Sequence, residues 1–293
     1  MGEILFDRRA ALTIAQPATN SFVRTQPNAI RIENLRMSFK VDKTRVKDPN
    51  TCECVVSNLS ETTRKQISQR GLKMILEAGY VGTMRQIFIG DIRNATTKRN
   101  GPDWETVIQS GDGERAFAYA RVTQAIKGPV DAGKLIGELA GKLGVGKGNS
   151  ARIAQVFAGK QKKFLNGHVA RGSVAKELTK VLDLEGYEWS IQDGELQILK
   201  PGEALPSISL EISPDTGLIG SPEWNVPDNR PNSKEHKSPF VSFKALLSPE
   251  LKPGGRVKLV SEAIDGNFAI RRVKHSGDTH GSEWYTEAEV TPL

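Results

Sequence analysis

The feature that most constrains this chain is the spacing of its apolar residues, which changes twice. Between Ile30 and Ile108, apolar and polar residues alternate with a period of two, as they do in half-buried β-strands. After Gly113 the apolar residues take the spacing of an amphipathic helix, and after Pro201 the alternation returns. A chain with this order is predicted to fold as β, then α+β, then β.

The first β-rich stretch contains five or six predicted strands and one short helix. An extra residue near Glu33 and Asn34 changes which side chains share a face, which predicts a β-bulge. Ser60 stands where the helix N-cap is expected, and Gly71 stands where the helix is expected to stop. These features predict a compact antiparallel barrel or sandwich.

The middle stretch predicts a small α+β domain. Asp131 and Ser173 precede two helical stripes and are predicted to cap them. Asp193 and Gly194 then separate two short alternating runs, and an Asp-Gly pair in this position is the strongest short-range signal of a β-hairpin. The domains expected are residues 1–111, 112–200 and 201–293.

The last stretch is again β. Its final run, from Trp284 to Val290, alternates residues for a packed face with residues for a solvated face. Asp265 and Gly266 predict a second hairpin turn. The expected fold class is therefore mainly β, with antiparallel β segments, as a barrel or a sandwich, on either side of an α+β insert.

Composition excludes some classes of protein. Hydrophobic residues make up 38% and charged residues 26%, which is ordinary for a globular chain and argues against wholesale disorder. No run approaches the 18 or so apolar residues of a membrane span. The net charge is +7, but the 41 lysines and arginines are spread along the chain, which predicts a solvated surface rather than a nucleic-acid-binding arm.

Cys52 and Cys54 are the only cysteines in the sequence. Two residues apart in a predicted strand, they face the same side of the sheet. Because no histidine lies near them in sequence, they make a poor zinc site. We interpret them as small apolar side chains in a protein that folds in the cytoplasm where it is made.

A glycine-rich run resembles a phosphate-binding loop. In GKLGVGKG, Gly141 is followed five residues later by Gly146 and Lys147. The next residue, Gly148, has no hydroxyl to bind Mg²⁺, and the run follows a predicted helix where the motif needs a buried strand. We therefore interpret it as a helix C-cap followed by a basic loop.

One short stretch, VKHSGDTHGSEW, concentrates the residues that carry chemistry. His275, Asp278 and His280 lie within six residues and are the candidate ligands for a metal such as Zn²⁺. A loop between strands does not give two histidines the fixed register that a helix does. No fourth ligand or general base is near in sequence, so metal binding and catalysis are the less favoured interpretation.

The favoured interpretation is a structural or interface loop. Gly277 and Gly281 permit unusual backbone angles, and Asp278 and Thr279 can hydrogen-bond the amides of their own loop. No nucleophile elbow or catalytic carboxylate pair is evident elsewhere in the sequence. We therefore expect no catalytic residues, no cofactor and no metal.

At this point the order of motifs resembles a known family. The stretch from Leu246 to Val290 contains a Pro-Gly before a strand, an Asp-Gly pair and a His-x-Gly-Asp-x-x-Gly-x-x-Trp run. The corresponding residues are Pro253, Gly254, Asp265, Gly266, His275, Gly277, Asp278, Gly281 and Trp284. Together with SPDTGLIGSPE and DPNTCECVVSNLSETTRKQI, this order resembles the baseplate hub proteins of contractile-tailed bacteriophages.

The resemblance implies a fold, an assembly and partners. Such hubs are similar to tail-tube proteins and carry two tube-like β domains, so a homotrimer presents six of them around the channel through which genomic DNA passes without sequence-specific binding. It implies contacts with the tail-tube protein, the central spike and the wedge or ripcord-type proteins of the virion tail baseplate. The loop would then connect two strands of the second tube-like domain and order a subunit contact.

Two other functions are weighed against this one. A tail-associated cell-wall hydrolase needs a catalytic carboxylate or metal centre, and no such motif is evident in the sequence. A basic nucleic-acid-binding module is expected to interleave its cations with stacking aromatics, but aromatic residues make up only 6% of this chain.

Overall fold

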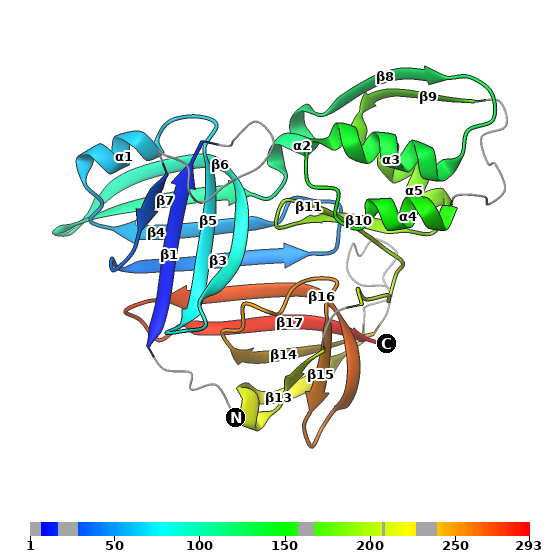
Figure 1. Cartoon of the computed structure of the whole chain (residues 1–293). Coiled ribbons are helices and arrows are strands. Elements are labelled where there is room, and N and C mark those ends of the chain that lie inside the picture. Colours follow the sequence, from blue (N-terminus) through cyan, green and yellow to red (C-terminus); the bar gives the residue numbers. More distant parts are fainter. Residues whose placement is uncertain (1–6, 17–28, 158–166, 207–208, 227–238) are drawn as a thin grey trace. The chain divides into compact units, whose positions relative to one another are not determined.

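The computed structural model describes residues 7–16, 29–157, 167–206, 209–226 and 239–293 (Figure 1). Strands account for 51% of the fold and helices for 19%, so the mainly β prediction is confirmed. None of the helices in these ranges has the length and apolar character needed to cross a membrane.

The chain forms two compact units. The first, the sheet unit, consists of Met1–Thr44, Thr51–Gly111 and Gly202–Leu293. The second, the insert unit, consists of Arg45–Asn50 and Asp112–Pro201. Both β-rich stretches of the sequence thus contribute to one unit.

The sheet unit contains the strands at both ends of the chain. Its elements are β1 (Arg8–Ala15), β2 (Ile30–Ile32), β3 (Met37–Thr44), β4 (Thr51–Ser57), α1 (Glu61–Ile67), β5 (Lys73–Tyr80), β6 (Arg85–Asn100), β7 (Asp103–Gly111), β12 (Leu210–Ile212), η1 (Pro214–Thr216), β13 (Leu218–Asn225), β14 (Phe240–Leu246), β15 (Arg256–Val260), β16 (Asp265–Asp278) and β17 (Trp284–Pro292). They form a 13-stranded sheet with the path β13-β14-β17-β16-β3-β4-β7-β6-β5-β1-β2, and β12 and β15 branch from β16.

The strand order of the sheet contains an internal repeat. The antiparallel order β3-β4-β7-β6-β5 in the first half is matched by β13-β14-β17-β16-β15 in the second. Both long strands have a bulge against their neighbour, at Ile92/Asn94 in β6 and at Ile270/Arg272 in β16. The two halves are therefore two copies of one five-stranded pattern, and we call them the first and second copies.

The two copies meet where β16 pairs with β3, and these strands run side by side (Figure 1). The pairing is antiparallel and runs from Arg272↔Thr44 to Asp278↔Ser38. At one end, the Arg272 guanidinium donates to both carboxylate oxygens of Asp42, at 2.9 and 2.5 Å. The described strands form an open sheet, and no closed barrel is present among them.

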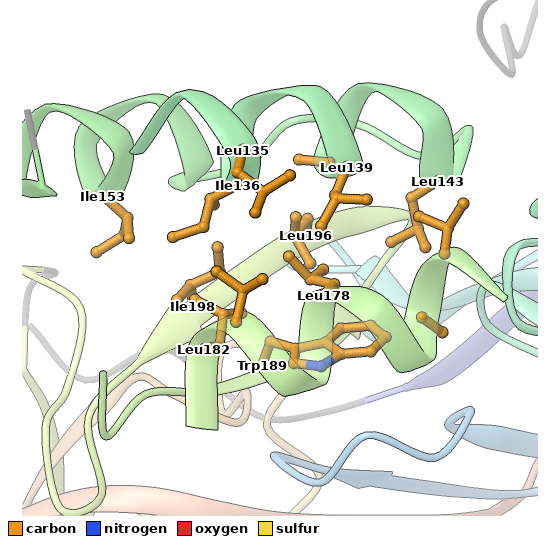
Figure 2. Packing of buried hydrophobic residues seen from close by; sticks show 14 of the residues in the cluster. Leu135, Ile136, Leu139, Leu143, Ile153, Leu178, Leu182, Trp189, Leu196 and Ile198 are labelled. Carbon is orange, nitrogen blue, oxygen red and sulfur yellow. The ribbon is translucent and has the colours of Figure 1, made fainter. Parts of the chain in front are cut away.

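The insert unit is small and has its own core. Its elements are α2 (Glu114–Tyr119), β8 (Arg121–Ile126), α3 (Ala132–Leu143), α4 (Ser150–Phe157), β9 (His168–Ser173), α5 (Val174–Leu184), β10 (Glu188–Gln192) and β11 (Glu195–Leu199). Figure 2 shows the apolar stripe of α3 facing side chains of β11 and α5. Asp131 caps α3 by accepting a hydrogen bond from the Lys134 amide, at 3.1 Å. Ser173 holds the N-cap position of α5, but its side chain makes no capping hydrogen bond.

The predicted hairpin at Asp193 and Gly194 is confirmed. Both residues have positive φ, 56° and 81°, as a two-residue turn with matching twist requires. The turn joins β10 to β11 and places Trp189 opposite Ile198. An Asp-Gly pair decides this turn locally, which is why the sequence alone predicted its register.

Three local predictions need correction. The residues at Glu33 and Asn34 separate two strands instead of forming a bulge, because β2 pairs with β1 while β3 pairs with β4 and β16. Helix α1 ends at Ile67 with Ser68 as its C-cap, so Gly71 lies in the turn before β5. Asp265 and Gly266 are the first residues of β16, because the turn of the hairpin is made by residues 261–264. The Ser261 hydroxyl accepts from the Ile264 amide and so closes this longer turn.

The two cysteines behave as predicted. Cys52 and Cys54 lie on the buried face of β4, with exposed fractions of 2% and 0%. Burial raises the pKa of the Cys54 thiol to about 12, so this group is neutral at physiological pH. Both therefore pack as small apolar side chains.

The glycine-rich run ends a helix, as predicted. Gly144 takes the left-handed C-cap conformation after α3, with φ of 76°. The loop that follows lies against β11, where the Gly148 amide donates to Glu195 Oε2 at 2.8 Å. A Cβ atom at Gly148 would lie 1.8 Å from the Leu196 carbonyl oxygen. Close packing on β11 therefore accounts for glycine at this position.

The positive charge is less evenly distributed than the spread of basic residues indicates. Residues 115–180 contain 13 lysines and arginines but only 3 acidic residues. Each of the three is engaged within the insert unit: Asp131 caps α3, Glu138 accepts from Gln124, and Glu177 pairs with Lys180. The scarcity of acidic residues, rather than a basic cluster, concentrates the excess charge in this segment.

Candidate functional site

The loop singled out by the sequence joins β16 to β17 in the sheet unit. His275 lies in β16 itself and is only 1% exposed. Its ring Nδ1 hydrogen-bonds the Thr286 hydroxyl of β17 at 2.9 Å. The same hydroxyl accepts from the Ser248 amide at 3.0 Å. The histidine therefore ties neighbouring backbone segments together inside the sheet.

Asp278 closes the turn at the end of β16. Its Oδ1 accepts from the His280 amide at 2.9 Å, and its Oδ2 accepts from the Arg36 guanidinium at 3.1 Å. Burial acts to raise the pKa of Asp278, but Arg36 and the amides of His280 and Gly281 together hold it below its ordinary value. The group is therefore a carboxylate at neutral pH, and both of its oxygens accept hydrogen bonds that hold the turn.

Two segments far from the loop in the sequence hold it in place. Thr279 exchanges two hydrogen bonds with Met37 of β3, from its amide to the carbonyl oxygen at 2.9 Å and from the Met37 amide to its hydroxyl at 3.0 Å. Arg8 of β1 donates to the Gly281 carbonyl oxygen at 2.8 Å. The loop thus connects the second copy to strands that precede it by more than 200 residues.

The base of the loop is packed too tightly for any side chain at Gly277. A Cβ atom there would lie 2.4 Å from Phe39 Cζ and 2.8 Å from Trp284 Cε3. Phe39 and Trp284 pack edge to face with ring centroids 5.5 Å apart, and Trp284 is 1% exposed. This packing lies at the junction of β16 with β3, so it fastens the two copies of the repeat to each other.

The three candidate metal ligands are used separately. His275 binds Thr286, Asp278 binds Arg36 and the turn, and His280 Nδ1 hydrogen-bonds the Thr279 hydroxyl at 2.9 Å. In the part of the chain that is described, no three histidine, cysteine or acidic side chains lie close enough together to hold a metal ion. Each of the three side chains hydrogen-bonds another protein group instead.

Sequence reasoning missed the partners of the loop. Arg8, Arg36, Met37 and Phe39 lie at the opposite end of the chain, and nothing in their local sequence marks them. Only the alternation of Met37 and Phe39 within a predicted strand was visible. Strand pairing across the repeat brings them to the loop.

The lowered pKa of Asp278 leads to a pH-dependent prediction. We expect Asp278→Asn to destabilise the sheet unit by about 1 kcal/mol at pH 7. The NH₂ group of asparagine is a hydrogen-bond donor and would face the Arg36 guanidinium, which is also a donor. A depressed pKa in the folded state means that this stabilisation is present above the pKa of the unfolded chain. It is lost as the pH falls through the folded-state value.

The measurement is urea unfolding of both proteins between pH 7 and pH 2. The difference in unfolding free energy should shrink as the pH falls below about 4, since protonation makes the native residue neutral too. A difference that stays constant over this range would show that the Asp278 charge contributes nothing to the loop.

The fold and the loop together define a class of protein: one built on a duplicated antiparallel sheet whose two copies are fastened to each other. A family described as baseplate hub gp41 matches residues 21–290. The chain belongs to this family. The family supports a structural role in the baseplate of a phage tail.

Solved structures share the fold. A tail protein from Neisseria meningitidis MC58 matches with a TM-score of 0.63 and 11% identity, covering 96% of each chain. The 43 kDa tail protein of prophage MuSo2 from Shewanella oneidensis matches with a TM-score of 0.60 and 7% identity, covering 97% of each chain. The Escherichia coli c3393 protein, a type VI secretion component, matches with a TM-score of 0.55 and 9% identity, covering 88% of this chain and 73% of its own. No curated protein sequence matches significantly.

Proposed function

We propose that three copies of this chain form a baseplate hub that adapts the sixfold tail tube to a threefold spike. Each chain contributes two tube-like β domains, residues 1–111 and 201–293, and the segment 112–200 is a separate domain. Six such domains surround the channel through which the genomic DNA leaves. The role is structural, without a catalytic centre, cofactor or metal.

The observation that carries the proposal is the internal repeat of the sheet. A chain with two copies of the pattern β3-β4-β7-β6-β5 presents, as a trimer, six copies arranged about a threefold axis. Such a ring matches a sixfold partner on one side and a threefold partner on the other. This is the simplest geometric reason for a duplicated sheet in a baseplate protein.

The loop of His275, Gly277, Asp278, Thr279, Gly281 and Trp284 has a defined role in this proposal. It sets the angle between the two copies, because it is bound to β1 and β3 as well as to its own strands. That angle decides whether three chains close into a ring. The surface of the finished ring then meets the tail-tube protein, the central spike and the wedge or ripcord-type proteins in the virion.

Native mass measurement over a range of protein concentrations tests the trimer. The expected species has three times the chain mass of 32.1 kDa. Imaging of the tail tip should then find three copies between tube and spike. Six copies in the tube, no copies in the particle, or a protein that stays monomeric at every concentration would each refute the hub assignment.

A further inference from the structure

Among the strand edges left open in the described sheet are those of β13 and of the second half of β6. β13 pairs with β14 on one side, and no described strand pairs with its other side. β6 pairs with β5 through residues 85–91, and along the same edge residues 94–100 have no strand partner among the described residues. Open antiparallel edges are aggregation hazards unless another chain covers them.

The repeat points to a partner for each of these two edges, because the equivalent edges of β16 and β3 already pair with each other within the chain. Ile92 and Arg93 precede Asn94 at the bulge of β6, just as Ile270 and Arg271 precede Arg272 at the bulge of β16. From the bulge, β6 runs to Asn100 and β16 to Asp278 over the same number of residues. The open part of β6 therefore corresponds to the part of β16 that pairs with β3.

The other open edge corresponds to β3. Read across the sheet, Lys40 lies opposite Glu53, Glu53 opposite Gln109, and Gln109 opposite Asn94. In the second copy, the row Glu223, Ser242, Glu289 and Arg272 has the same pairings. Both rows end at the residue that follows the bulge, so Glu223 of β13 is the equivalent of Lys40 of β3.

We propose that β13 of one subunit pairs antiparallel with residues 94–100 of β6 in the next subunit, in the register of the β16–β3 junction. This rests on the proposed trimer and names the surfaces by which it closes. The trimer then has three β16–β3 junctions within chains and three equivalent β13–β6 junctions between chains. Closure of the ring covers the open edges of β13 and β6.

The register between subunits follows from the junction within the chain. Ser276 lies opposite Lys40 there, and its equivalent in β6 is Lys98. Lys98 is therefore placed opposite Glu223, a pair of opposite charges that favours this register. The residues on either side of Lys98 follow, with Thr97 opposite Trp224.

The exposed tryptophans support the same assignment. Gly277 lies opposite Trp284, and the equivalent position in the first copy, Arg99, lies opposite Trp104. Trp284 is 1% exposed because β3 packs beside it, whereas Trp104 is 41% exposed where no such strand is present. Trp224 on β13 is 53% exposed. Pairing of the two edges would bury more of both large apolar rings.

A charge swap tests the register. Glu223→Lys places two lysines opposite each other and should raise the midpoint concentration of trimer formation about tenfold or more. Adding Lys98→Glu should restore the midpoint. The matched control combines Glu223→Lys with Lys176→Glu, which makes the same change of charge at an exposed α5 residue outside the proposed junction, and should restore nothing. Equal recovery in control and swap, or recovery in neither, would overturn the register.

Disulfide trapping tests the pairing itself. In the full chain, Thr97→Cys with Trp224→Cys should give covalent trimers on mild oxidation, because these residues face each other across the proposed junction. Gln86→Cys with Trp224→Cys is the control, because β5 already covers that part of β6. Trimers by mass without the Thr97 cross-link would overturn the edge pairing and leave the hub intact. Monomers at every concentration without cross-links would overturn both.

Discussion

Replacing Trp284 with alanine is expected to lower the unfolding free energy of the sheet unit by about 3–5 kcal/mol. The side chain is 1% exposed and packs edge to face on Phe39 of the other copy, so its removal leaves a cavity at the β16–β3 junction. Urea unfolding followed by circular dichroism, at a concentration where the chain is unassembled, measures the loss.

Trp104→Ala is the matched control for this prediction. It removes the same side chain from the equivalent position of the first copy, but there the ring is 41% exposed and stacks beside the Arg64 guanidinium. We expect a loss of about 1 kcal/mol or less in the unassembled chain. Equal losses at the two positions would show that Phe39 and the junction do not stabilise the sheet unit.

Trp189→Ala is expected to have a similarly large effect, about 3–5 kcal/mol, on the insert unit. Its ring is 3% exposed and stacks on Phe117 with centroids 5.3 Å apart. Its Nε1 donates to the Thr179 hydroxyl at 3.0 Å. The substitution removes this donor as well as the ring. Thr179→Val keeps the Trp189 ring but removes this hydrogen bond and the one from the Thr179 hydroxyl to the Ala175 carbonyl oxygen, so it should cost about 1 kcal/mol.

The two tryptophan variants also test whether the units unfold separately. Each side chain lies in the core of one unit, so each variant should shift one unfolding transition and leave the other in place. Hydrogen exchange of backbone amides in β16 and α3 reports on the two units individually. If each variant accelerates exchange as much in β16 as in α3, the two units unfold together as one cooperative block.

Predictions from the sequence succeeded where the deciding interaction is local. The Asp193-Gly194 turn, the Asp131 cap and the burial of Cys52 and Cys54 all depend on residues within a few positions of each other. The helix stop at Gly71 and the turn at Asp265 failed for a related reason. A second local solution, the Ser68 cap or the Ser261 turn, was available a few residues earlier, and the sequence pattern does not rank the two.

The candidate loop was found from its own residues, but its role required the tertiary structure. Clustered histidines, glycines and an aspartate mark a special loop, and they are compatible with both a metal site and a tight connection. The structure supplies the partners that the sequence does not show, because His275 faces Thr286 and Asp278 faces Arg36. Arg36 lies 242 residues away in sequence, and no local pattern specifies such a pairing.

The sequence by itself determined the order of β, α+β and β segments, because side-chain periodicity depends only on neighbours along the chain. It did not determine that the two β segments form one sheet. That depends on which strand edges pair. Strands pair through main-chain hydrogen bonds, which are the same for nearly all side chains. Tertiary structure decides it: β16 pairs with β3, and Phe39 and Trp284 pack so closely over Gly277 that a side chain there would collide with both rings.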